Sequence, residues 1–258
     1  MKEYTERIFQ TVNELSGALH PGAEAEGRVP LGADALLMEQ RVGHLIRETR
    51  YRYPKVQVSP RATSFLNVAE AVLRGELPLA LVALDEGAPA LPAELTAEKL
   101  PPLPLVPVGS PSLAAADDLA HALRSVRVLT INAECTCHRP LLAALRDRYG
   151  IDAPVIEAGS VGGVRELARS GYGVAMLPPE PSLAAQHLAV IPTLPSCELD
   201  VRVLYAQPEH LSQAARSVLE LLRRLPLPAA GTDRMAAVTS LTVLNQQTDN
   251  RPLHQIAS

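Results

Sequence analysis

The chain has 258 residues, of which 47 % are hydrophobic and 20 % are charged, and its formal net charge at pH 7 is −4. This length and apolar content suffice for one large core or two modest ones. The net negative charge argues against a broad surface for a polyanion, so we expect no direct contact with nucleic acid from these residues.

Three cysteines are too few for a disulfide scaffold, and their odd number suits a reducing compartment. The first ten residues contain no apolar signal core, and no apolar run is long enough to cross a bilayer. We therefore expect a cytoplasmic protein with no membrane partner.

Both ends of the chain differ from its middle. The pattern of residues 1–22 predicts a helix whose apolar residues are alternately four and three apart, which is the spacing of a coiled-coil seam. One interpretation is a linker or dimerisation helix. The other is a surface helix packed on its own domain. Residues 226–258 are small and polar and predict a flexible tail.

Between these ends, apolar strands alternate with amphipathic helices. The pattern predicts strands over 28–33, 56–58, 79–84, 103–108, 126–131, 154–156, 174–177, 188–191 and 201–205, and helices over 36–53, 64–74, 115–123, 139–149, 164–169 and 211–225. Proline-marked transitions near Val106 and Pro195 divide the elements into two groups, with a last strand and helix returning to the first. This order predicts an α/β fold with two lobes.

The stretch Glu157–Glu180 shows the repeating unit most clearly. It contains a strand end, a turn of Ser160, Val161 and two glycines, a short helix and a second apolar strand. A parallel crossover places the start of its helix at the carboxyl end of the first strand, where free amides favour a polar or anionic ligand. A turn that only fits the helix against the strand explains the same residues.

Four predicted helices begin just after strands, and ligands of open α/β sheets bind at that edge. The candidate effector-binding residues at these four helix starts are Ala33, Asp34, Thr63, Ser64, Glu134, Cys135, Thr136, Ser160, Val161 and Gly162. For each Ser or Thr, ordinary helix capping is the competing interpretation.

Four segments together resemble the effector-binding domain of LysR-type transcriptional regulators: Gly27–Ala33, Tyr53-Pro54, Leu73–Val82 and Glu157–Pro178. The resemblance covers residues 1–225, and it rests on the order and spacing of motifs that are individually weak. The sequence departs from the family at Pro78, where an acidic residue is usual, and at Ala33-Asp34, where a hydroxyl residue is common.

The resemblance implies a two-lobed, periplasmic-binding-protein-like (type 2) fold made of two Rossmann-like subdomains joined by two crossover segments. It places one regulatory subdomain over residues 28–107 and 198–225 and the other over 108–197, with a small effector, for example a carboxylate, in the cleft. It further implies self-association as dimers or tetramers, and DNA contact only through a winged helix-turn-helix that this sequence lacks.

Two features bear on the chemistry of the cleft. Asp34 and Glu134 would repel a carboxylate unless neutral or paired, and would favour an effector with a donor or a cationic group. Cys135 and Cys137 lack the second pair of ligands that a zinc site needs, so we expect no metal here. We also expect no cofactor and no catalytic residue. The favoured interpretation is that both thiols line the cleft or are buried. A helix N-terminus would lower the pKa of Cys135.

Three hypotheses follow. The favoured one is the effector-sensing domain of a LysR-type transcriptional regulator, which is not an enzyme. The alternatives are a free-standing solute-binding protein of the same fold, and a redox sensor or enzyme that uses Cys135 or Cys137 with His138.

Overall fold

The computed structural model describes residues 25–84, 90–135, 137–180 and 182–225. The helix expected over residues 1–22, the tail expected over 226–258 and the candidate residue Thr136 lie outside these ranges.

Within the described residues, five strands form the sheet of the first lobe, in the order β2-β1-β3-β10-β4. They are β1 (Gly27–Ala33), β2 (Val56–Ala62), β3 (Leu79–Leu84), β4 (Thr96–Lys99) and β10 (Cys197–Tyr205). The central strand β1 is parallel to β2 and β3, whereas β10 is antiparallel to β3 and β4.

The second lobe repeats this arrangement, with the described strands in the order β7-β6-β8-β5-β9. They are β5 (Leu103–Gly109), β6 (Arg127–Thr130), β7 (Val155–Glu157), β8 (Gly173–Leu177) and β9 (Ala189–Val190). Here β6 is the central parallel strand, and β5 takes the antiparallel place that β10 has in the first lobe. This duplication is not visible as a repeat in the sequence.

Two long strands run from one lobe into the other. Cys197–Leu199 of β10 pairs with Leu103–Leu105 of β5, and each strand then continues into its own lobe. The partner change in β5 falls at Val106, where the proline-rich pattern of the sequence indicated a transition. We retain residues 28–107 with 198–225, and 108–197, as the proposed subdomain boundaries.

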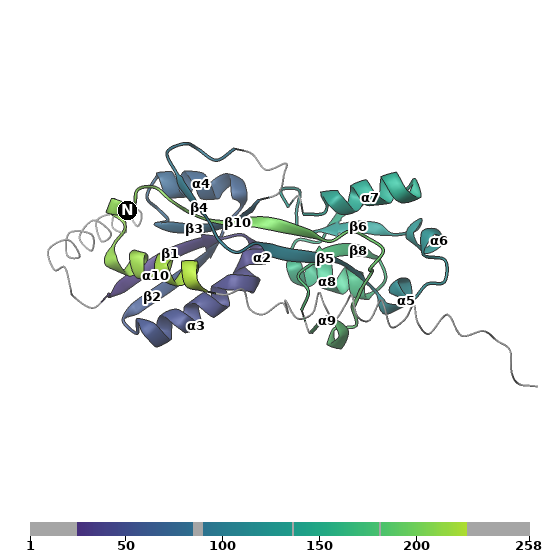
Figure 1. Cartoon of the computed structure of the whole chain (residues 1–258), viewed down its shortest axis with the longest axis horizontal. Coiled ribbons are helices and arrows are strands. Elements are labelled where there is room, and N and C mark those ends of the chain that lie inside the picture. Colours follow the sequence, from purple (N-terminus) through teal and green to yellow (C-terminus); the bar gives the residue numbers. More distant parts are fainter. Residues whose placement is uncertain (1–24, 85–89, 136, 181, 226–258) are drawn as a thin grey trace, which may run out of the picture. The chain divides into compact units, whose positions relative to one another are not determined.

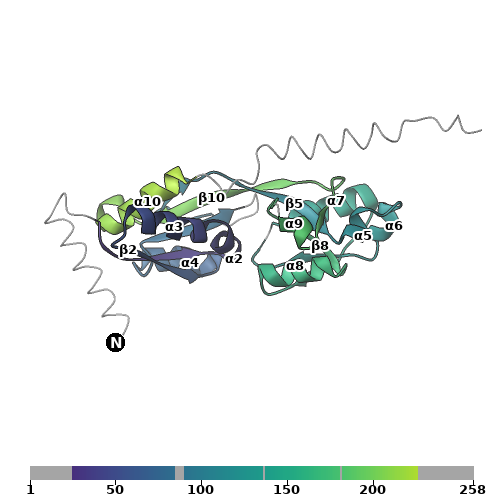
Figure 2. The ribbon, with the colours of Figure 1, turned by 90° about the horizontal axis from the view of Figure 1, so that it is seen from below.

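Helices cover both faces of each sheet (Figures 1 and 2). In the first lobe, α3 (Gly43–Arg52) and α10 (Gln213–Arg224) pack on one face, and α4 (Phe65–Leu73) packs on the other. In the second lobe, α7 (Arg139–Tyr149) and α8 (Val161–Arg169) lie on opposite faces. The described shorter helices are α2 (Ala35–Leu37), α5 (Pro111–Ala114), α6 (Leu119–Leu123) and α9 (Ser182–Ala185), with a 3-10 turn at Pro208–His210.

The core is aliphatic because the central strands are apolar on both faces. Leu31, Leu79 and Leu81 are completely buried in the first lobe, and Val128 and Val174 are completely buried in the second. Continuous burial of this kind is typical of parallel strands covered by helices on each side. Both sheets are therefore covered by helices on each face, and their edges carry the loops that connect strands to helices.

Three predicted elements differ from the structure. The predicted helix over 36–53 is interrupted by a π-helical segment at Met38–Val42. Of the helix predicted over 115–123, only α6 forms. Asp118 is its N-cap, and the Asp118 carboxylate accepts a hydrogen bond from the His121 amide at 2.9 Å. No strand was predicted between residues 84 and 103, but β4 lies there, because its backbone pairs with β10.

Candidate functional site

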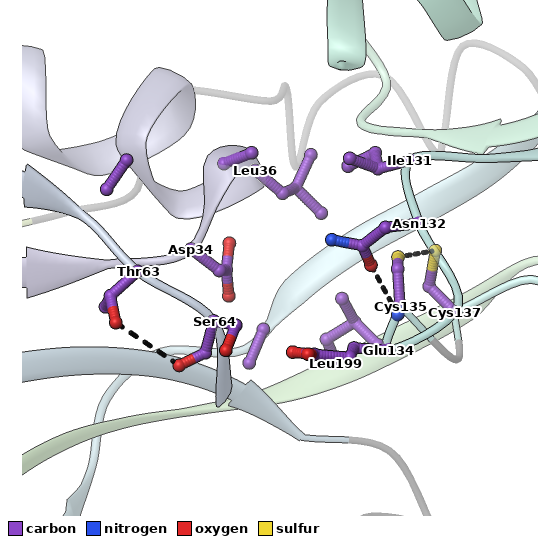
Figure 3. A pocket seen from close by; sticks show the side chains of 13 residues that line it. Asp34, Leu36, Thr63, Ser64, Ile131, Asn132, Glu134, Cys135, Cys137 and Leu199 are labelled. Atoms are coloured by element: carbon purple, nitrogen blue, oxygen red, sulfur yellow. Dashed lines mark hydrogen bonds between the residues drawn. The ribbon is translucent and has the colours of Figure 1, made fainter. Parts of the chain in front are cut away.

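A cavity of about 350 Å³ lies between the two lobes, within the range of about 300–1,000 Å³ that is typical of small-molecule sites. Its described lining consists of Asp34, Ala35, Leu36, Ala62, Thr63, Ser64, Ala83, Ile131, Asn132, Glu134, Cys135, Cys137 and Leu199. Figure 3 shows the first-lobe residues Asp34, Thr63 and Ser64 on the opposite side of the cavity from Asn132 and Cys135 of the second lobe. Both lobes therefore contribute polar groups.

Asp34 is the half-buried acid on the first-lobe wall. It follows β1 and caps α2, since its carboxylate accepts a hydrogen bond from the Leu37 amide at 2.8 Å. Burial raises the pKa of the Asp34 carboxyl above its ordinary value, and hydrogen bonds from the backbone of Leu37, Ala83 and Leu36 oppose that rise. A positively charged group beside Asp34 would offset the cost of burying this charge.

Ser64 stands at the N-cap position of α4 but does not cap it. Its side chain makes no capping hydrogen bond, and its Oγ is buried without any hydrogen-bond partner. The neighbouring Thr63 hydroxyl makes only a long contact of 3.4 Å with the Ser64 carbonyl oxygen. Because an unpaired buried hydroxyl is costly, a ligand that reaches Ser64 Oγ would gain a hydrogen bond for which no internal group competes.

The second-lobe wall is the loop that connects β6 to α7. The Asn132 side-chain oxygen accepts from the Cys135 amide at 2.9 Å, and the buried Thr130 hydroxyl lies 3.2 Å from the carbonyl oxygens of Asn132 and Cys135. These contacts fix the turn that presents Cys135 and Cys137 to the cavity (Figure 3).

The Sγ atoms of Cys135 and Cys137 are 3.2 Å apart. A hydrogen bond from the Cys137 thiol lowers the pKa of Cys135 to about 7, although burial opposes this shift. The pKa of Cys137 rises well above its ordinary value, because Cys137 donates that hydrogen bond and is itself buried. Cys135 is therefore the nucleophilic thiol of the pair.

Three of the four predicted helix starts contribute to the cavity. Asp34, Thr63, Ser64, Glu134 and Cys135 line it. Ala33 is fully buried at the end of β1 and is outside the described lining. Ser160, Val161 and Gly162, at the start of α8, are also outside that lining, and the Ser160 hydroxyl caps α8 by accepting from the Gly163 amide at 3.0 Å.

Sequence reasoning missed several lining residues. Asn132 follows β6, so the rule that ligands bind at the carboxyl ends of parallel strands could have identified it. Leu199 could not be found in this way, because it belongs to the crossover strand β10 and reaches the cavity through the pairing of that strand with β5.

A second group of contacts joins the lobes outside the cavity lining. Arg165 of α8 donates to Glu39 at 2.8 Å and to Glu180 at 3.1 Å, and the Gln40 amide donates to Glu180 at 2.6 Å. Glu39 and Gln40 belong to the π-helical segment of the first lobe, so this group, which we call the Arg165 latch, connects α8 to the opposite lobe.

The LysR substrate binding domain family model matches residues 22–226. The chain belongs to this family. Among similar solved structures, the reduced form of the regulatory domain of OxyR2 from Vibrio vulnificus is 20 % identical, with 79 % of this chain and 99 % of that chain covered and a TM-score of 0.61. ArgP from Mycobacterium tuberculosis is 17 % identical, with 86 % and 74 % covered and a TM-score of 0.65.

The effector binding domain of QuiR in complex with shikimate is 18 % identical, with 78 % of this chain and 97 % of that chain covered and a TM-score of 0.59. No curated protein matched the sequence. Family membership and fold establish a LysR-type regulatory domain with a two-lobed, periplasmic-binding-protein-like fold, as the sequence resemblance predicted.

LysR-type regulatory domains sense effectors, and this family is not typically enzymatic. In the described part of the chain, no helix is long and apolar enough to span a bilayer. Over the same residues, no three His, Cys, Asp or Glu side chains come together as metal ligands.

Proposed function

We propose that the cavity between the lobes is the effector site of this LysR-type domain, and that ligand binding changes the relation of the lobes to control transcription. The observation that supports this most is a cavity of about 350 Å³ into which both lobes present polar side chains. A ligand that contacts both walls binds one arrangement of the lobes better than another, and it can shift their equilibrium only by that difference.

Ser64 and Thr63 are the proposed hydrogen-bonding residues of the first lobe, with Asp34, Glu134 and Cys135 as further contacts. The Ser64 hydroxyl has no internal partner to compete with a ligand. Ser160, Val161 and Gly162 stay predictions for a ligand large enough to extend beyond the described lining. Association into dimers or tetramers, and control of DNA binding through a separate DNA-binding part, are proposed from the family.

A thermal-shift screen of small carboxylates, amines and aromatics tests this proposal. A ligand present at about 100 times its Kd adds about 2.7 kcal/mol of stability, which raises the Tm by roughly 5–10 °C for a domain of this size. We expect Ser64→Ala and Thr63→Ala to reduce that shift.

Ser212→Ala is the matched control, because the Ser212 hydroxyl caps α10 by accepting from the Ala215 amide at 3.2 Å and is outside the described cavity lining. This control should lower the Tm of the free protein and leave the ligand-induced shift intact. A hit that stabilises the wild type, Ser64→Ala and Thr63→Ala equally would contradict the proposed site.

The thiol pair supports a second candidate, a redox sensor. An Sγ separation of 3.2 Å must shorten to about 2.05 Å for a disulfide, which is a small movement within one loop. Hydrogen peroxide would take two electrons from the two thiols: its O–O bond breaks, one disulfide forms and two water molecules are released. A loss of two hydrogens after peroxide treatment, measured by mass spectrometry and absent in Cys137→Ser, would support this candidate. An effector that binds the cavity with unchanged affinity after oxidation would oppose it.

A further inference from the structure

The charges that line the cavity all have the same sign. Asp34 and Glu134 contribute carboxylates from opposite lobes, and the described lining includes no Lys, Arg or His. Part of Cys135 is a thiolate near neutral pH. The negative charge of Asp34, on the other side of the cavity, acts to raise the pKa of Cys135. An anionic ligand would therefore add a further like charge to a lining that is otherwise mostly aliphatic.

The N-terminus of α4 does not reverse this balance. The N-terminus of α4 offers a partial positive charge of roughly half a unit, which is less than one carboxylate. Together with the free Ser64 hydroxyl, it suits the uncharged acceptor of a ligand, such as a carbonyl or hydroxyl oxygen. The ionisable groups of the lining, by contrast, are acids, and a cation beside Asp34 would oppose the rise in its pKa that burial causes and so favour the carboxylate.

We infer that the effector is a small organic cation, with a protonated nitrogen beside Asp34 and Glu134 and an apolar body against Leu36, Ile131 and Leu199. This inference rests on the proposed effector site and specifies its ligand class. Asp34 supplies the principal contact, since it is half-buried, whereas Glu134 is exposed.

Cys135 allows the potential of the cavity to be measured without knowledge of the effector. Three methanethiosulfonate reagents differ in charge: 2-(trimethylammonium)ethyl, methyl and 2-sulfonatoethyl methanethiosulfonate. In each case the Cys135 thiolate attacks the sulfenyl sulfur, a new S–S bond forms and methanesulfinate leaves. If Cys137 then displaces the tag as a thiol, a Cys135–Cys137 disulfide results, and the Cys135 thiol is consumed in both outcomes.

The measurement uses Cys197→Ser protein, with consumption of Cys135 followed by peptide mass spectrometry at pH 7 and 2-mercaptoethanol as the reference thiol. We expect the cationic-to-anionic rate ratio at Cys135 to exceed that of the reference about tenfold at low salt, and to fall as salt is added. A ratio equal to or below that of 2-mercaptoethanol overturns the inference.

Two variants assign the potential to its source. Asp34→Asn retains a good helix-capping residue, so the protein should still fold. It should reduce the cationic-to-anionic rate ratio several-fold. Glu134→Gln should reduce that ratio less. Asp117→Asn is the matched control, because Asp117 is exposed and outside the described cavity lining, and it changes the net charge equally. An Asp117→Asn effect as large as that of Asp34→Asn would also overturn the inference.

An equilibrium experiment with isosteres separates this inference from the proposed function. Benzamidine, benzamide and benzoate have nearly the same shape and carry positive, zero and negative charge. Benzamidine should bind wild type about tenfold more tightly than benzoate and lose that advantage in Asp34→Asn. Tighter binding of benzoate, lost in Ser64→Ala, would preserve the effector site and refute its cationic ligand.

Discussion

The helices α4 and α8 occupy equivalent places in the two lobes, and their N-termini differ in one respect. Each connects the edge parallel strand to the next parallel strand, and each has serine at the N-cap. The Ser160 hydroxyl accepts from the Gly163 amide at 3.0 Å, whereas the Ser64 hydroxyl is buried without a partner beside the cavity. Serine at the same topological position thus caps α8 in one lobe, whereas in the other lobe its hydroxyl is not used to cap α4 and could bond a ligand.

The first turn of α8 gives the largest expected effect. A Cβ on Gly163 would collide with the Ala158 carbonyl oxygen, whereas a Cβ on Gly162 would meet only Ser160 Oγ at 3.9 Å. Gly163→Ala should therefore destabilise the domain by about 2–3 kcal/mol in urea unfolding. Gly162→Ala should be neutral or stabilising by about 0.5–1 kcal/mol, and equal effects of the two substitutions would refute this account of the turn.

The second prediction concerns the pH dependence of Cys135. With a pKa of about 7, half of its thiol is ionised at neutral pH, and iodoacetamide labelling should slow about tenfold for each pH unit below that value. Cys137→Ala should raise this midpoint, because it removes the hydrogen bond that stabilises the Cys135 thiolate. An unchanged profile in Cys137→Ala, which retains no donor at all, would show that another group lowers the pKa.

The two N-cap serines provide the direct comparison. Ser160→Ala should cost about 1 kcal/mol of unfolding free energy, because α8 loses its capping hydrogen bond. Ser64→Ala should leave the unfolding free energy unchanged or raise it by up to about 1 kcal/mol, since it loses no hydrogen bond and removes an unpaired buried hydroxyl. Chemical denaturation of both variants measures the difference, and a Ser64→Ala loss as large as that of Ser160→Ala would show that α4 depends on this hydroxyl.

The Arg165 latch gives the smallest expected effect. Arg165→Gln should lower stability by roughly 0.5–1 kcal/mol, with a smaller loss at high salt, because partly exposed ion pairs are weak and screened. Arg169→Gln is the control on the same helix, since Arg169 pairs with Glu166 within α8. Only Arg165→Gln should increase hydrogen exchange in the Met38–Val42 segment, and a similar increase in both variants would argue against a latch.

Much of the fold was predictable because apolar strands and amphipathic helices leave periodic patterns. The helix Arg139–Tyr149 was identified at the correct residues, and it ends at Gly150, which has the left-handed conformation typical of that position. The strand β4 was missed because its residues, Thr96–Lys99, are small or charged, and only pairing with β10 defines it.

The site was predictable only in part, for a similar reason. Sequence order identifies helix starts at the edges of sheets, and this led to Asp34, Ser64 and Cys135. It does not specify which starts meet across the lobes, because that depends on how β5 and β10 connect the two sheets. Ser160 has the local signature of the other three starts, and tertiary arrangement alone separates it from the described cavity lining.

The central claim is that a small molecule binds between the lobes and uses the free hydroxyl of Ser64. A crystal structure of the domain with a hit from the thermal-shift screen tests it most directly. We predict ligand density in the cavity, with an acceptor atom within hydrogen-bond distance of Ser64 Oγ and contacts to the Asn132–Cys135 loop. Ligand density at another surface, with Ser64 Oγ still unpartnered, would contradict the account.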